Sequence, residues 1–295
     1  MAVFASAEIA QPSRVDLGRI TLNVLDTGGD ASLLLLHGFP ECAAAWTPII
    51  AALAPRFRCI APDQRGYGLS DRPGRPADYA LAELIEDVAA LLDKCGLARA
   101  TIVGHDWGGV VAAWFAARHP KRVERLVLIN GPHPAALQEA LLDDPAQRAA
   151  SAYITAFRQP GAAERLMAGG AAAAWATIFG GVPSMAGRRD AYIHAWSQPG
   201  AAQAMLDWYR ASPFVVPGGG GAPRPPWLDA EDLRVRRPTL AIWGMRDHVL
   251  LPRLLDRLAD HIDDLQIERI EDAGHAVIHE QPSRVAELIE RFTLS

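Results

Sequence analysis

Residues 104–109 constrain the fold most, because they read Gly-His-Asp-Trp-Gly-Gly between an apolar run at 100–103 and a helix-like run at 110–118. A strand, a turn with glycine on both sides of a reactive residue, and a helix form the context of a nucleophile elbow. Glycine permits both the sharp turn and close packing of the helix on the strand. The central residue is Asp106, which could also act only as the N-cap of the helix. As a nucleophile, a carboxylate would attack saturated carbon and form an alkyl ester.

Short apolar runs recur on both sides of this motif and predict strands. They occupy residues 32–36, 57–63, 100–103, 123–129, 239–244 and 265–270. Runs this short and this apolar are typical of strands buried on both faces. Weak alternation over 13–27 predicts a hairpin, and helical spacing predicts helices at 46–54 and 81–92. Strands that alternate with helices predict an α/β protein with a mostly parallel sheet flanked by helices.

The strand pattern stops at residue 132 and resumes only after residue 228. The intervening residues contain Ala-rich helical runs, many aromatics and breaks at Pro and Gly. We therefore expect one α/β core formed by residues 1–131 and 229–295, with residues 132–228 as an inserted helical cap. The four glycines at 218–221 are not followed by Lys and Ser or Thr, so they predict a flexible loop and not a phosphate-binding loop.

Polar residues follow several predicted strands, at the edge of a parallel sheet where active sites lie. Asp247 follows the strand at 239–244, and His275 follows the strand at 265–270. With Asp106 the chain order is nucleophile, acid, base, which is the order of a hydrolase triad. His275 and His279 have the i, i+4 spacing of some metal ligands, but no Glu follows the first and no third ligand is evident. We therefore expect no metal.

Charge and cysteine content exclude several classes of partner. The formal net charge is −5, without a block of like charge, so nucleic acid and anionic membranes are not expected partners. Three separated cysteines indicate a reducing compartment. Residues 1–10 do not read as a signal peptide, and no apolar run reaches 18 residues. These features predict a soluble cytoplasmic protein and leave its oligomeric state open, with a dimer as one option.

Several motifs together resemble the α/β-hydrolase family and, within it, the soluble epoxide hydrolases. They are His-Gly-Phe-Pro-Glu at 37–41, Asp-Gln-Arg-Gly-Tyr-Gly at 63–68, the elbow at 104–109, and Gly-His at 274–275. The similarity extends over nearly the whole chain and implies an α/β-hydrolase fold with a helical cap. It also implies an enzyme that converts a small apolar epoxide and water into a vicinal diol without a cofactor.

Two cap segments, 153–161 and 206–210, resemble the lid-tyrosine segments of epoxide hydrolases. The resemblance implies that Tyr153 and Tyr209 point into the site, where two phenols could hydrogen-bond and protonate the departing epoxide oxygen. The alternative is that both rings only pack between helices. The match is incomplete, because Arg158 replaces a common Gln and Asp207 a common Asn.

The implied reaction has two steps. Asp106 attacks an epoxide carbon, and His275, oriented by Asp247, then activates the water that hydrolyses the ester. The backbone N–H groups of Phe39 and Trp107 would hold the oxyanion. Candidate substrate-binding residues are His37, Pro40, Trp175 and Trp208. The cap tryptophans are typical of an apolar substrate pocket and equally of simple helix packing.

Two other functions remain open. A haloalkane or haloacid dehalogenase would use the same Asp106, with Trp107 and Trp175 as halide donors. Against it, Phe39 stands where many such enzymes have a polar residue, and no Arg follows Asp106 as in fluoroacetate dehalogenases. The second is a ligand-binding protein of the same fold without catalysis, which the fold alone does not exclude.

Overall fold

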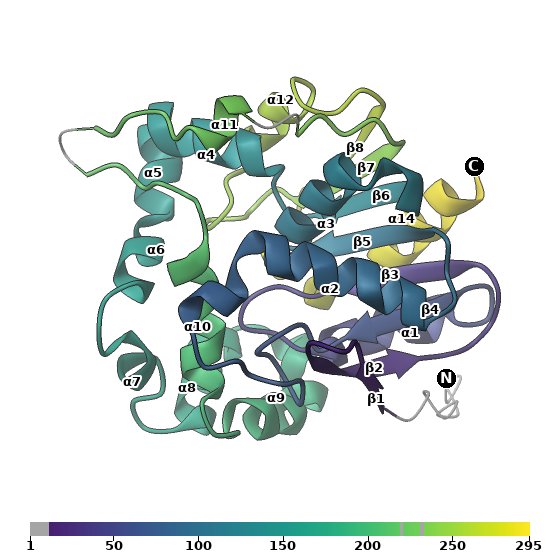
Figure 1. The fold of residues 1–295 in the computed structure, drawn as a ribbon, viewed down its shortest axis with the longest axis horizontal. Coiled ribbons are helices and arrows are strands. Elements are labelled where there is room, and N and C mark those ends of the chain that lie inside the picture. Colours follow the sequence, from purple (N-terminus) through teal and green to yellow (C-terminus); the bar gives the residue numbers. More distant parts are fainter. Residues whose placement is uncertain (1–11, 219–220, 231–232) are drawn as a thin grey trace.

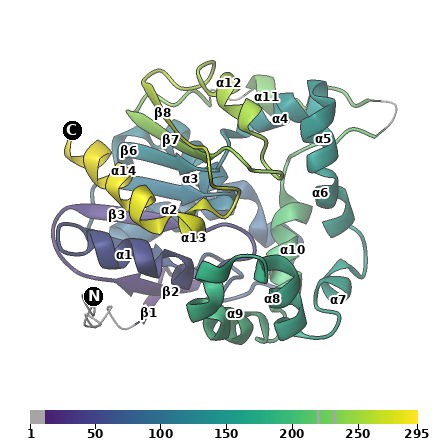
Figure 2. The ribbon, with the colours of Figure 1, turned by 180° about the vertical axis from the view of Figure 1, so that it is seen from behind.

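The computed structural model describes residues 12–218, 221–230 and 233–295. Their centre is an eight-stranded sheet in the order β1-β2-β4-β3-β5-β6-β7-β8, with helices on both faces (Figures 1 and 2). The strands are β1 Ser13–Asp16, β2 Thr21–Asp26, β3 Ser32–Leu36, β4 Arg58–Pro62, β5 Ala100–His105, β6 Val123–Ile129, β7 Thr239–Gly244 and β8 Leu265–Ile270.

The sheet is mostly parallel, as predicted. β1 and β2 form the expected antiparallel hairpin, β2 also pairs antiparallel with β4, and all pairs from β4 to β8 are parallel. Each predicted apolar run contains a strand, with ends that differ by at most two residues. Every residue of β3, β5 and β7 is buried, because helices cover both faces of the central sheet.

Helices α1 and α14 cover one face of the sheet, and α2 and α3 cover the other (Figures 1 and 2). The core helices are α1 Thr47–Leu53, α2 Leu81–Lys94, α3 Trp107–Arg118, α12 Leu255–Leu258, α13 Val277–Glu280 and α14 Pro282–Leu294. Short 3-10 helices occupy Ala43–Trp46, Pro76–Tyr79, Pro120–Arg122, Pro183–Arg188 and Pro252–Leu254.

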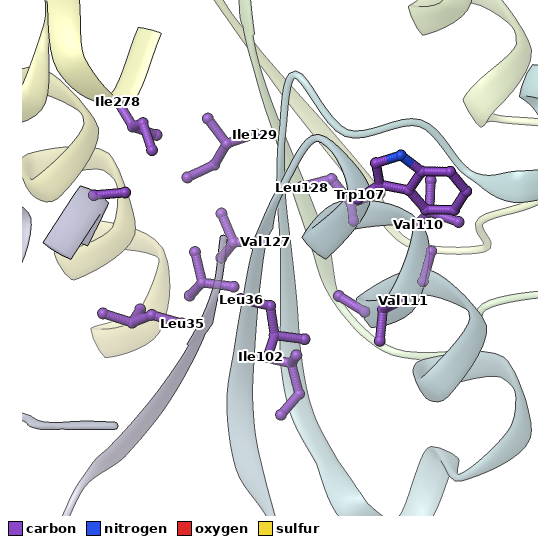
Figure 3. Packing of buried hydrophobic residues seen from close by; sticks show 14 of the residues in the cluster. Leu35, Leu36, Ile102, Trp107, Val110, Val111, Val127, Leu128, Ile129 and Ile278 are labelled. Atoms are coloured by element: carbon purple, nitrogen blue, oxygen red, sulfur yellow. The ribbon is translucent and has the colours of Figure 1, made fainter. Parts of the chain in front are cut away.

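Neighbouring residues of one strand serve opposite faces of the sheet, as the two-residue period of a strand requires. In Figure 3, Leu36 points toward Val111 of α3, whereas Leu35 points to the side of Ile278 on α13. Both leucines are at most 1% exposed. This two-sided packing fixes the ends of two strands: β5 ends directly before the predicted nucleophile Asp106, and β3 ends at the loop that carries Phe39.

The chain between β6 and β7 is helical. It contains α4 Pro134–Asp143, α5 Pro145–Ala150, α6 Ala152–Phe157, α7 Ala162–Leu166, α8 Ala171–Phe179, α9 Arg189–Trp196, α10 Ala201–Ala211 and α11 Trp227–Ala230. In its described part, strand-like pairing is limited to two isolated bridges, Gly218 with Gly221 and Val235 with Ile262. Helices α6 to α10 lie together beside the sheet (Figures 1 and 2). We keep residues 132–228 as the proposed cap.

Across the described ranges, every helix is too short or too polar to cross a membrane. The prediction about a signal peptide concerns residues 1–10, which lie outside the described residues, as do 219–220 of the predicted glycine loop.

Candidate active site

The turn between β5 and α3 carries its unusual backbone conformation at Asp106 itself, with φ +50° and ψ −118°. Non-glycine residues rarely adopt positive φ, and where they do the strain usually serves a function. The neighbouring glycines are required for close packing and not for an unusual backbone conformation. A Cβ at Gly104 would lie 2.2 Å from the Gly108 carbonyl oxygen, and a Cβ at Gly108 would lie 2.0 Å from the Leu36 carbonyl oxygen. Only glycine lets α3 approach the sheet this closely.

The Asp106 carboxylate has two oxygens in different surroundings. Its Oδ1 accepts a hydrogen bond from the Phe39 backbone N–H at 2.8 Å. Its Oδ2 lies 3.6 Å from His275 Nε2. A Cβ at Gly38 would lie 2.5 Å from the Asp106 Cβ, so glycine is required beside the carboxylate. Trp107 is the first residue of α3, where backbone N–H groups have no partner within the helix.

His275 is oriented by a fully hydrogen-bonded carboxylate. Its Nδ1 donates to Asp247 Oδ2 at 2.8 Å, and the Asn130 side-chain amide donates to the same oxygen at 2.6 Å. The other oxygen of Asp247 accepts the backbone N–H groups of Val249 and Leu250 at 2.7 and 2.9 Å. Burial opposes ionisation, but His275 and these hydrogen bonds hold the pKa of Asp247 below its ordinary value. Sequence reasoning missed the support that Asn130 gives to Asp247.

The charge of His275 depends on its two carboxylate neighbours. Burial disfavours the charged ring, but Asp247 and Asp106 together raise the pKa of His275 well above its ordinary value. The imidazolium is therefore favoured while Asp106 is ionised. If Asp106 became a neutral ester, one of the two stabilising charges would disappear and the ring would give up its proton more easily.

Removal of the Asp106 charge is expected to lower the pKa of His275, because the imidazolium then has one carboxylate neighbour instead of two. The measurement is an NMR titration of His275 in wild type and in Asp106→Ala. Asp190→Ala is the matched control, because that side chain is 96% exposed in the ion pair it forms with Arg189. An unchanged His275 titration in Asp106→Ala would contradict the coupling.

Tyr153 of α6 and Tyr209 of α10 lie together above Asp106. Their ring centroids are 5.9 Å apart at 83°, and Tyr209 also packs edge-on against the Trp107 indole at 5.2 Å. Tyr153 and Tyr209 line a small cavity together with Asp106. The rest of its lining is mainly apolar, formed by Trp107, Val110, Pro132, Leu137, Ile154, Phe214 and Leu250. The structure thus brings the predicted nucleophile and both phenols to one cavity.

Burial, followed by the nearby Asp106 carboxylate, raises the pKa of Tyr153. Burial, followed by Tyr153 and Asp106, raises the pKa of Tyr209 well above its ordinary value. Both phenols therefore stay protonated near neutral pH and can donate hydrogen bonds into the cavity.

Arg158 joins the segments that carry the two tyrosines. Its guanidinium donates to the Tyr209 carbonyl at 2.8 Å, the Ser212 hydroxyl at 2.9 Å and the Phe214 carbonyl at 2.8 Å. It follows α6 and so fixes the end of that helix to the end of α10. Asp207, the other departure from the family pattern, is buried and accepts from Arg210 at 2.9 Å. Both unusual residues thus have local partners.

The residues predicted to bind substrate lie elsewhere: within the described chain, none of the four lines the cavity at Asp106. His37 is fully buried, with Nδ1 donating to the Gly38 carbonyl at 2.9 Å and Nε2 accepting the Gln64 N–H at 3.0 Å. The Pro40 carbonyl accepts the Trp196 indole N–H at 2.8 Å. Both residues fix the loop after β3 and its contact with the helices above it.

The two candidate tryptophans also serve packing. The Trp208 indole N–H donates to the Arg65 carbonyl at 2.9 Å, and its ring packs against Trp107 at 5.8 Å. Trp175 lies on α8 beneath the Arg189 guanidinium, 5.8 Å from the ring centroid. Neither tryptophan is among the residues that line the cavity at Asp106.

Sequence reasoning missed a buried polar cluster behind the predicted triad. Glu41 Oε2 accepts from the Gly38 N–H at 2.9 Å and from His105 Nδ1 at 3.0 Å, and Glu41 Oε1 accepts from His279 Nε2 at 2.6 Å. His105 Nε2 donates to the His275 carbonyl at 2.9 Å. The available signals were Glu41 in the motif at 37–41 and His105 beside the nucleophile.

His105 donates through both ring nitrogens, which only the imidazolium can do. Burial opposes this charge, but Glu41 raises the pKa of His105 above its ordinary value. Burial likewise opposes ionisation of Glu41, but His105 and His279 hold the pKa of Glu41 well below its ordinary value. The resulting buried ion pair ties the Gly38 loop, the elbow and the backbone of His275 together.

Comparison with known proteins agrees with this geometry. The family described as alpha/beta hydrolase fold matches residues 31–282. AB hydrolase superfamily protein YfhM of Bacillus subtilis is 34% identical, over 94% of this chain and 96% of the relative. Epoxide hydrolase 2 of Caenorhabditis elegans is 32% identical, over 94% of this chain and 78% of the relative. A solved structure reported among novel epoxide hydrolases in metagenomes from hot environments is 40% identical, with a TM-score of 0.85 over 96% of this chain and 98% of the other.

Sheet order, elbow and family match define the class, and the chain belongs to the α/β hydrolases. Within that class it belongs to the epoxide hydrolase family, as the motifs at 37–41 and 104–109 indicated.

Proposed function

We propose that the protein hydrolyses small apolar epoxides to vicinal diols through a covalent ester on Asp106. The observation that carries this proposal is that Asp106 and the phenols of Tyr153 and Tyr209 line one cavity. A carboxylate below and two protonated phenols above are what opening of an epoxide requires: a nucleophile for carbon and acids for the departing oxygen.

In the first step, Asp106 Oδ2 attacks an epoxide carbon, and the electron pair of the breaking C–O bond passes to the epoxide oxygen. That oxygen takes a proton from one phenol, giving a hydroxyalkyl ester. The other carboxylate oxygen, already 2.8 Å from the Phe39 N–H, becomes the ester carbonyl oxygen in the oxyanion site. The His275 imidazolium, now facing a neutral ester, releases the proton that restores the phenol.

In the second step, neutral His275 removes a proton from water, which attacks the ester carbonyl carbon. The N–H groups of Phe39 and Trp107 stabilise the oxyanion, and the diol leaves with the proton from His275. The acid regenerated at Asp106 returns its proton to His275, which restores the resting ion pair. Asp247 keeps the ring oriented throughout.

The donor arrangement favours this reaction over dehalogenation. An alkoxide accepts strong hydrogen bonds from phenols, whereas a halide is a weak acceptor. Trp175, the second halide donor considered from the sequence, is not among the lining residues described for this cavity. A binding protein without catalysis would not require the ordered triad of Asp106, Asp247 and His275.

The test is product analysis of the purified protein with terminal epoxides and with matched chloroalkanes. We expect diol from the epoxides and no halide release. A first turnover in ¹⁸O-labelled water should place the label in Asp106 and not in the diol, because the diol oxygen comes from the carboxylate. Halide release without diol, or label in the first diol formed, would refute the proposal.

Loss of both phenols should slow ester formation strongly, because the departing oxygen then has no proton donor. We expect Tyr153→Phe or Tyr209→Phe alone to retain part of the rate, and the double variant to lose about 10²–10⁴-fold. Stopped-flow measurement of the alkylation step is the readout. Tyr79→Phe is the matched control, because its hydroxyl donates to the Pro73 carbonyl, away from the cavity. Normal alkylation by the double variant would contradict the assignment.

A further inference from the structure

A second hollow, the outer groove, lies on the far side of one wall of the reaction cavity. It has a volume of about 440 Å³. Its lining is mostly apolar, with three polar or charged residues, and comes from α2, α3, the end of α10 and the segment up to α11, including Ala82, Ile85, Trp114, Ala211, Pro213 and Trp227. It contains none of the triad residues or the two phenols. The reaction described above does not use it.

Consecutive turns of α3 connect the two spaces. Val110 lines the reaction cavity, and Trp114 lines the outer groove. Residues four apart on a helix are neighbours on one face. Two adjacent residues after α10 also face the two spaces: Pro213 lines the groove, and Phe214 lines the cavity. The two spaces are therefore separated by about one layer of side chains.

Phe214 is the aromatic ring in that layer. Its centroid lies 5.9 Å from Trp107 on the cavity side and 6.0 Å from Trp227 on the groove side, and it is 2% exposed. Its backbone is fixed, since its carbonyl accepts from Arg158 at 2.8 Å. Trp227 is also held, because its indole N–H donates to the Pro213 carbonyl at 3.1 Å. The Phe214 ring is hydrocarbon without a hydrogen bond, so its rotation breaks none.

We propose that Phe214 is a movable partition, and that an epoxide too long for the reaction cavity displaces its ring and extends its apolar end into the outer groove. This inference rests on the proposed function and names the substrates that the site takes: epoxides with an extended alkyl or aryl chain. The groove supplies what the small reaction cavity lacks, namely room on apolar side chains for the far end of a long substrate once the Phe214 ring has moved.

The experiment compares kcat/KM for 1,2-epoxybutane and 1,2-epoxydecane. Ala82→Trp fills the groove from α2, where residue 82 is exposed and tolerates a large side chain. We expect the kcat/KM for 1,2-epoxydecane relative to that for 1,2-epoxybutane to fall about tenfold. This is the effect of keeping one or two methylenes of the longer chain in water, at roughly fourfold each. Phe214→Ala should raise the same ratio, and adding Ala82→Trp should cancel that rise. An unchanged ratio in Ala82→Trp overturns the proposal.

Ala52→Trp is the matched control, since residue 52 is an exposed alanine on α1, on the opposite face of the sheet (Figures 1 and 2). It should leave the ratio unchanged. Calorimetric titration with 1-butanol and 1-octanol separates the two hypotheses. If wild type hydrolyses no epoxide, the proposed function fails. The groove proposal is still upheld in that case if Ala82→Trp weakens the affinity for 1-octanol more than the affinity for 1-butanol. Equal octanol-to-butanol ratios in wild type and Ala82→Trp refute it.

Discussion

Asp106→Ala should abolish epoxide turnover, with a loss of about 10⁴–10⁶-fold in kcat, the range found when a nucleophile is removed from a triad. The reason is structural as well as chemical. Asp106 is the residue that the elbow holds at positive φ, with one oxygen on the Phe39 N–H and the other facing His275. Diol formation measured by chromatography is the readout.

The control for this variant is Asp190→Ala, which removes the same charge from an exposed position on α9 and should retain full activity. Alanine at position 106 must also adopt positive φ, so the thermal unfolding temperature of each variant should be measured alongside activity. Turnover by Asp106→Ala within tenfold of wild type would show that water attacks the epoxide directly.

His275→Gln should arrest the enzyme after ester formation. Alkylation needs the Asp106 carboxylate and the phenols, whereas hydrolysis of the ester needs a base for water. His275 is in position for that role, because its Nε2 lies 3.6 Å from Asp106 Oδ2. Intact-protein mass spectrometry should find the protein heavier by the mass of one epoxide. Peptide mapping should locate that mass at Asp106. One equivalent of epoxide should be consumed rapidly, followed by almost no further reaction.

Two variants complete this experiment. The double variant Asp106→Ala with His275→Gln should form no adduct, because it has no nucleophile. His194→Gln, at an exposed position on α9, should turn over normally without adduct. Normal steady-state turnover by His275→Gln would refute the two-step scheme.

The sheet could be predicted from sequence because its central strands are buried on both faces. A strand such as β6 then appears as a continuous apolar run, and the run at 123–129 coincides with Val123–Ile129. The end of α2 was less predictable, since the apolar spacing stops at residue 92 while the helix continues to Lys94. Helix ends depend on local hydrogen bonds that hydrophobic periodicity does not report.

The candidate site divides in the same way. Residues at strand ends, such as Asp106, Asp247 and His275, could be placed because parallel strands end at one edge of the sheet. The position of a residue could not be predicted where only its side-chain type suggested a role in binding. His37 and Trp208 are aromatic side chains with ring nitrogens that could bind a ligand. In the structure, these nitrogens form hydrogen bonds with backbone groups instead.

The Glu41 cluster was beyond sequence reasoning for a different reason. Glu41 contacts His105 across 64 residues and His279 across 238 residues of the chain. Spacing rules cover neighbours on one element and do not reach partners this distant. This pairing also gives His279 a partner other than the metal ion considered from its spacing to His275. Its side chain is directed to Glu41 and not toward His275.

The span of that cluster has a consequence for biogenesis. A nascent polypeptide exposes the elbow long before His279 is synthesised, so during translation Glu41 has only one of its two imidazole partners. The reactive carboxylate also lacks its base until residue 275 has left the ribosome. In the proposed mechanism, hydrolysis of the ester therefore becomes possible only after residue 275 has been synthesised and has folded against Asp106.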